Sequence, residues 1–159
     1  MYSCHFPKSE RLCSKKLIEA LFEGGHISMS AYPIRAVFMP INIDAGKSAP
    51  PIQVMMSVSK RHFKHAVDRN RVKRQLREAY RLNKHILDEK LKDDQHLIIA
   101  FIWLSNELFE TATIQNKMQK LLQRIAEESR KLTIKEQDHT HCLPTDCNEE
   151  CAKQPTEAL

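Results

Sequence analysis

The sequence predicts a single α+β domain in which helices cover a small sheet. Two observations indicate this fold class. Segments with apolar residues at helical spacing alternate with short segments of strand character, and residues 96–103 form a continuous apolar run typical of a strand buried on both faces. The chain has 159 residues, the length of one domain, and its hydrophobic fraction of 42% is sufficient for a core.

The first half of the chain predicts one helix followed by two strands. Residues 8–23 place leucine, isoleucine and phenylalanine at helical spacing, and a pair of glycines ends the pattern. Residues 32–40 have the apolar and β-branched character of a strand, residues 41–51 contain turn-forming residues, and residues 52–59 read as a second strand. A further short strand near residues 26–31 remains open.

The second half predicts a helix, a buried strand and a long closing helix. The first of these helices begins at Asp68 or Asn70 and ends near His85, and a polar linker over residues 88–95 leads to the strand at residues 96–103. The closing helix is expected to begin at Ser105 and Asn106. Its side chains that face the core are expected to be those of Leu108, Ala112, Met118, Leu121, Leu122, Ile125 and Ala126.

The C-terminal residues differ in composition from the rest of the chain. Residues 136–159 contain six acidic residues, one lysine and two prolines, and they show no apolar periodicity. This composition is typical of a disordered acidic tail, so the folded domain is expected to span residues 1–135.

The cysteines predict neither a disulfide framework nor a metal site. Their number is five, which is odd, and the N-terminus has no apolar signal sequence, so exported disulfides are not expected. Three of them lie near two histidines in the tail, which raises zinc as an alternative. Their spacings of five and four residues do not match a zinc ribbon or finger, so unpaired thiols are preferred.

Positive charge is concentrated in one segment. Residues 60–84 contain ten basic and two acidic residues, a net charge of +8, whereas the whole chain carries +5 and the remainder therefore −3. A solvated helix face usually interleaves glutamate at i,i+4 spacing, and this segment barely does so. Segregated positive charge of this kind indicates a polyanion-binding surface.

Helical spacing divides this segment into two faces. One face is apolar and consists of Val72, Leu76, Ala79 and Tyr80. The opposite face presents Asn70, Lys73, Arg74, Arg77, Arg81 and Lys84. Arg71 projects to the far edge of the cationic row, and Arg69 lies near its border with the apolar face. The first face is expected to pack on the sheet and the second to bind nucleic acid.

These residue types suit RNA. Arginine offers a planar fork that reaches two phosphate oxygens or stacks on a base. Asn70, between two arginines, supplies both a donor and an acceptor for a sugar hydroxyl or a base edge. An arginine-rich helix also fits a DNA major groove, but the order of elements contains no helix-turn-helix, so RNA is preferred.

The motif with the most information covers the end of the second strand and the basic helix. Residues 57–61 read Ser-Val-Ser-Lys-Arg, and residues 66–81 read Ala-Val-Asp-Arg-Asn-Arg-Val-Lys-Arg-Gln-Leu-Arg-Glu-Ala-Tyr-Arg. Here the sequence closely resembles the protein subunit of bacterial ribonuclease P. The first-helix segments Phe6-Pro-Lys-Ser-Glu-Arg-Leu12 and Leu21-Phe-Glu-Gly-Gly25 resemble the same family, and the resemblance spans roughly residues 6–130.

The resemblance implies a fold, a function and partners. The fold would be a ribosomal-S5-domain-2-like sandwich with a left-handed β-α-β crossover, although parallel strands are usually connected in the right-handed sense. The protein would bind the catalytic RNA and the 5′ leader of precursor tRNA and support endonucleolytic removal of that leader. Catalysis would belong to the RNA subunit, magnesium would be bound mainly through that RNA, and no protein partner is implied.

The resemblance also implies two RNA-binding surfaces. The surface that docks on the catalytic RNA would consist of Lys60, Arg61, Arg69, Asn70, Arg71, Lys73, Arg74, Arg77 and Arg81. A cleft between the first helix and the sheet would hold the single-stranded leader, where stacking on aromatic rings tolerates any base. Its candidate residues are Phe6, Lys8, Arg11, Phe22, Tyr32 and Arg35.

The sequence departs from the family pattern at three places. His62 to His65 fill a stretch where the family commonly has a glycine, and they make that loop one residue longer. Ile18 occupies the position of a first-helix aromatic residue, which makes that leader contact aliphatic or weaker. The acidic tail has no counterpart in the family pattern.

The sequence contains no recognisable hydrolytic machinery. Asp68 and Glu78 lie among cations and are better interpreted as charge partners than as a general acid and base. Two other classes remain as alternatives, a stand-alone nuclease and a ribosome-associated RNA-binding protein. No apolar run reaches the roughly 18 residues of a membrane span, so no membrane association and a cytoplasmic location are expected.

Overall fold

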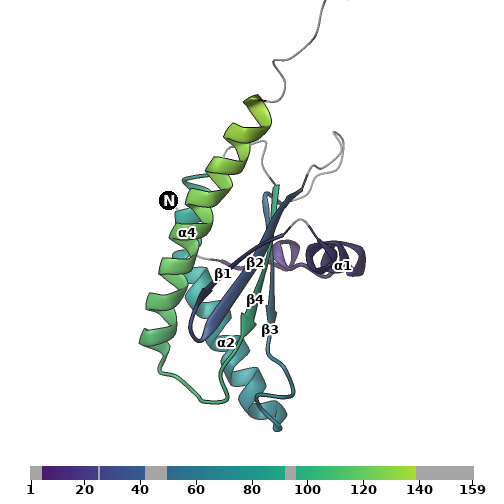
Figure 1. Cartoon of the computed structure of the whole chain (residues 1–159). Coiled ribbons are helices and arrows are strands. Elements are labelled where there is room, and N and C mark those ends of the chain that lie inside the picture. The colour runs from purple at the N-terminus through teal and green to yellow at the C-terminus, as the bar shows by residue number, and fades with distance from the viewer. Residues whose placement is uncertain (1–4, 25, 42–49, 92–95, 139–159) are drawn as a thin grey trace, which may run out of the picture.

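The computed structural model describes residues 5–24, 26–41, 50–91 and 96–138 (Figure 1). The elements in chain order are the 3₁₀ helix η1 (Lys8–Glu10), α1 (Lys15–Glu23), β1 (Ile27–Ala31), β2 (Ile34–Ile41), β3 (Ile52–Ser57), α2 (Ala66–Asn83), α3 (His85–Asp88), β4 (His96–Trp103) and α4 (Thr111–Asp138). This order confirms the α+β class, and β1 is the short strand that the sequence left open.

The strands form a sheet in the order β1-β2-β4-β3. Both β1 and β4 pair with β2 in the antiparallel sense, whereas β3 and β4 are parallel. Ile99 in β4 pairs with Phe38 on one side and with Val54 on the other. The basic helix α2 therefore connects two adjacent parallel strands. The left-handed sense of this crossover stays a prediction.

Helices cover the two faces of the sheet unequally. Figure 1 shows α2 and α4 on one face and the shorter α1 on the other. The core under α2 and α4 is the larger one, and its bulkiest fully buried side chains are Trp103, Tyr80, Phe38, Phe101, Ile34, Leu76, Leu87, Leu97, Ile99 and Ile114. The cluster under α1 consists of Leu12, Leu21, Val37, Ile98 and Ala100. Side chains alternate along β4, and its residues contribute to both clusters. The strand is therefore buried on both faces, as its apolar run predicts.

The first predicted helix is wrong over its N-terminal part. Residues 8–10 form η1, and α1 begins only at Lys15. Between them Arg11 bridges to Val54, and the Leu12 backbone N–H donates to the Val54 carbonyl at 3.0 Å. This segment therefore lies along the edge of β3. Its backbone N–H bonds to a distant strand and not to a carbonyl one helical turn earlier, so no helix forms here.

The closing helix begins later than predicted. The Ser105 hydroxyl accepts a hydrogen bond from the Glu107 backbone N–H at 3.0 Å and so stabilises a turn before the helix. Leu108 precedes the helix and is 42% exposed, and Ala112 is also exposed, so both were wrongly placed in the core. Ile114 is buried instead. The five remaining predicted core residues, from Met118 to Ala126, are buried.

The boundary of the predicted tail is shifted. The helix α4 continues to Asp138, so residues 136–138 belong to it. The rest of the predicted tail, residues 139–159, lies outside the described residues, as do its three cysteines. The prediction of a domain followed by an acidic tail therefore stays a prediction, with a later start for the tail.

Candidate nucleic-acid interface

The helix α2 divides into the two faces that its periodicity predicts. Val72, Leu76, Ala79 and Tyr80 are its buried residues. The side chains of Asn70, Arg71, Arg74 and Arg77 are exposed, and those of Lys73 and Arg81 are half-buried. Packing against the sheet and against α4 thus orients the helix so that its cations point outward.

The side chains of Arg71, Arg74 and Arg77 have no hydrogen bond or ion pair within the part of the chain that the structure describes, and the same holds for the side chains of Asn70 and Lys73. Unpaired guanidinium groups exposed on one helix face provide several donors each at fixed angles. They are therefore available to bind phosphate groups without first breaking an internal contact.

Arg69 has a different environment from its neighbours. Its Nη1 donates to the backbone carbonyls of Phe63 and Lys64, both at 2.8 Å. Phe63 is buried in the core, so these bonds tie the loop before α2 to the first turn of the helix. The structure thus assigns Arg69 a positioning contact that helical phase alone does not reveal, and its predicted contact with RNA stays a prediction.

The loop after β3 carries two further predicted cations, Lys60 and Arg61, and both are exposed. The Arg61 backbone N–H donates to the Ser59 hydroxyl at 3.2 Å, which stabilises the turn that carries both cations. Nearby, His62 Nδ1 and Asn106 Oδ1 are 2.7 Å apart, so this loop is joined to the loop after β4. The sequence did not indicate this contact.

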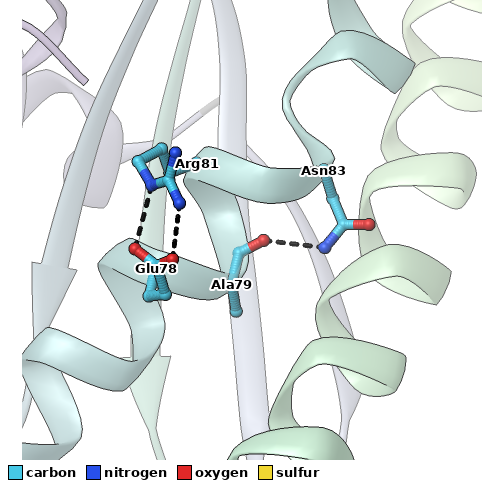
Figure 2. Close-up of polar contacts among 4 residues, drawn as sticks. All are labelled: Glu78, Ala79, Arg81 and Asn83. Carbon is cyan, nitrogen blue, oxygen red and sulfur yellow. Dashed lines mark hydrogen bonds and ion pairs between the residues drawn. The ribbon is translucent and has the colours of Figure 1, made fainter. Parts of the chain in front are cut away.

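In the C-terminal part of α2, one arginine is paired with a carboxylate of the same helix (Figure 2). Arg81 donates from Nε to Glu78 Oε2 at 2.9 Å and from Nη2 to Glu78 Oε1 at 2.6 Å. The hydrogen bond from Arg81 lowers the pKa of the Glu78 carboxyl below its ordinary value. The carboxylate therefore offsets the charge of Arg81 over a wide pH range, as the sequence interpretation of Glu78 as a charge partner expects.

Lys84 does not belong to the exposed cationic row in which the sequence placed it. Its Nζ donates to the His5 carbonyl at 2.7 Å and to Glu10 Oε1 at 3.0 Å, and the residue is buried. This contact anchors the N-terminal segment to the end of α2. The unpaired positive charge of α2 is therefore concentrated between Asn70 and Arg77.

Two of the predicted leader residues lie against the α2 side of the molecule. The Phe6 ring packs edge-on against Tyr80 with centroids 5.5 Å apart, and the Arg11 guanidinium carbon lies 5.5 Å from the Phe6 centroid. Burial raises the pKa of the Tyr80 phenol, so its hydroxyl stays protonated. Through its contact with Tyr80, Phe6 is partly buried against the large core. The neighbouring Lys8 is exposed.

The remaining leader residues lie elsewhere. Arg35 alternates with core residues of β2 and so projects on the α1 face, where its Nε donates to the Ser28 hydroxyl at 2.8 Å. Phe22 on α1 is 44% exposed. Tyr32 lies in the β1–β2 turn, donates to the Ser105 hydroxyl at 3.0 Å and packs against Phe109. The six candidates therefore lie in three parts of the described structure, and the prediction that they form one leader cleft stays a prediction.

Two other kinds of feature are absent from the described residues. No group of three or more histidine, cysteine, aspartate or glutamate residues there is arranged to hold a metal ion. No helix in the same residues is long and apolar enough to cross a membrane.

An α+β domain whose described part presents, on one helix, exposed arginines without a side-chain partner has the electrostatic footprint of a nucleic-acid-binding protein. The family model described as Ribonuclease P matches residues 6–126. The ribonuclease P protein component of Porphyromonas gingivalis is 42% identical over 120 residues, which cover 75% of this chain and 85% of that relative. The corresponding protein of Chlorobaculum tepidum is 34% identical over 108 residues, which cover 61% of this chain and 66% of that relative.

Solved structures agree at the level of the fold. The ribonuclease P protein of Thermotoga maritima has a TM-score of 0.56 at 22% identity and covers 72% of this chain and 96% of its own. The Staphylococcus aureus protein has a TM-score of 0.55 at 19% identity and covers 73% and 94%. The chain belongs to the family of ribonuclease P protein components, and it is therefore a tRNA-processing subunit.

Proposed function

We propose that this chain docks on the catalytic RNA of ribonuclease P through the outward face of α2 and the Lys60–Arg61 loop. The observation that supports this proposal is the group of exposed arginines Arg71, Arg74 and Arg77, whose side chains have no partner within the described residues. Each cation that neutralises a phosphate releases a condensed counterion, so such a surface binds RNA strongly at low salt. Arg69 contributes by holding the loop that leads into this helix.

The 5′ leader of precursor tRNA is the second proposed RNA ligand. Phe22 offers an exposed ring on α1, and Arg35 offers a cation on the sheet face that α1 partly covers. An aromatic ring and a guanidinium group both stack on any base, which suits a leader of variable sequence. Phe6 and Tyr32 make packing contacts on the other side of the sheet, so they are proposed to support this site only indirectly.

The chain is proposed to support endonucleolytic removal of the leader, with the chemistry supplied by the RNA subunit. Magnesium would be held mainly by RNA phosphates and bases, and the cations of α2 would neutralise the phosphates next to the protein. The proposed location is the cytoplasm, where precursor tRNA is available.

Reconstitution tests this function against the two alternative classes. The full chain, ribonuclease P RNA and a precursor tRNA with a labelled 5′ leader are mixed singly and together at physiological magnesium. The proposal predicts leader release only when both the chain and the RNA are present. Cleavage by the chain alone, abolished by one side-chain substitution, would establish a stand-alone nuclease. Recovery of ribosomal RNA in place of ribonuclease P RNA with the tagged chain would favour a ribosome-associated protein.

A further inference from the structure

An open pocket of about 530 Å³ lies beside the first turns of α2, where the helix meets the start of α4. It is lined by Val67, Asn70, Arg71, Arg74, Gln75 and Thr111. Its volume falls within the range of about 300–1,000 Å³ that is usual for small-molecule sites. Four of these residues belong to one stripe of α2 at i, i+3, i+4 and i+7, so one helix face supplies most of the lining.

One wall of the pocket is held in place by hydrogen bonds. Gln75 Nε2 donates to the Phe109 carbonyl at 3.2 Å and to the Thr111 hydroxyl at 3.1 Å. These bonds join α2 to the segment that enters α4. Because the donors of the Gln75 amide point to that segment, the amide is fixed in orientation. Its Oε1 is a buried acceptor without a partner within the described residues.

The lining combines three kinds of group. Arg71 and Arg74 are exposed cations without a partner in the described part of the chain, and they suit a phosphate. Val67 is 77% exposed and offers an apolar surface to the face of a base. Asn70 is exposed and carries both a donor and an acceptor, which suit a base edge or a 2′-hydroxyl.

We infer that this pocket holds one unstacked nucleotide of the RNA on which α2 docks. A phosphate on a regular RNA helix would use only the two arginines and would leave Val67 without a contact. A nucleotide turned out of its stack presents a phosphate, a base face and a base edge together, and the pocket has a complementary group for each. This inference rests on the proposed docking of α2 and adds a defined nucleotide site to it.

The test compares Val67→Ser with Arg74→Ala in binding titrations of the full chain on ribonuclease P RNA at several salt concentrations. Val67→Ser removes apolar surface without changing charge. It is expected to weaken binding by about fivefold at every salt concentration and to leave the salt slope unchanged. Arg74→Ala is expected to weaken binding and to flatten the log-log slope by about 0.7–0.9. Leu82→Ser, on the same helix and outside the pocket, is the matched control and should bind as the parent does.

Chemical probing of the RNA bases supplies the second measurement. Binding of the parent chain should change the reactivity of one nucleotide at its base edge, and Val67→Ser should restore the reactivity found in free RNA. If Arg74→Ala weakens binding while Val67→Ser binds normally, α2 docks on phosphates and the nucleotide pocket is wrong. If neither substitution changes affinity, both the pocket and the proposed docking face are wrong.

Discussion

The arginines of α2 differ in what their guanidinium groups contact. Arg69 donates to two backbone carbonyls, and Arg81 is paired with a glutamate. Arg71 and Arg74 have no partner among the residues that the structure describes. Helical phase predicts the direction of a side chain but not the groups that it meets. For that reason the sequence could assign all four to one RNA-binding face and could not separate the positioning residue from the exposed cations.

The contacts of Arg69 lead to a stability prediction. Arg69→Ala should lower the free energy of unfolding by about 1.5–3 kcal/mol, because it removes charge-assisted hydrogen bonds to a loop that buries Phe63. Arg71→Ala removes no side-chain contact within the described residues, so it should change the free energy of unfolding by less than about 0.5 kcal/mol. Urea denaturation of both variants measures the difference. Equal midpoints for the two variants would show that the Arg69 contacts contribute nothing to the fold.

At the scale of elements, strong periodicity predicted structure well. The strand β4 has the bounds that its apolar run predicts, and α2 has the predicted buried face, although it begins earlier, at Ala66. The errors occur where long-range contacts replace local ones. The Leu12 N–H bonds to β3, so no helix continues there, and the Ser105 turn delays α4. Neither contact leaves a periodic signal in the sequence.

The orientation of α2 is tested by two valines on the same helix. Val72 is fully buried, whereas Val67 is 77% exposed. Val72→Asp should abolish cooperative unfolding, because it places an unpaired charge in the core under the helix. Val67→Asp should melt as the parent does, because its carboxylate remains in water. Thermal melts followed by circular dichroism compare them. A normal melt for Val72→Asp would mean that the helix has another phase.

At the scale of the whole molecule, the sheet separates two surfaces. The unpaired cations of α2 lie over one face, and Arg35 and α1 lie on the other. The sequence identified the α2 cations by charge and helical spacing and the leader residues by resemblance, but it could not predict which strands pair or on which face of the sheet the leader residues lie. Phe6 and Tyr32 were therefore grouped with Phe22, although packing places them elsewhere.

Removal of residues 139–159 tests the extent of the domain. The core residues of α4 among the described side chains all precede Ser129, so a chain ending at Asp138 should keep the parent melting temperature. The removed segment carries four acidic residues. Differential scanning calorimetry of both chains is the measurement. A clear drop in melting temperature would show that the deleted segment packs on the domain.

The proposed docking of the α2 cations on the catalytic RNA is measured through the salt dependence of binding. Arg71→Ala/Arg74→Ala is compared with Lys16→Ala, which removes an exposed cation from α1 on the opposite face of the sheet. The double variant should bind more weakly at low salt, and its log-log slope against salt should fall by about 1.4–1.8, because each phosphate that is no longer neutralised lowers it by about 0.7–0.9. Lys16→Ala should keep the parent affinity and slope. An unchanged slope and affinity in the double variant would contradict the assignment of this face to RNA.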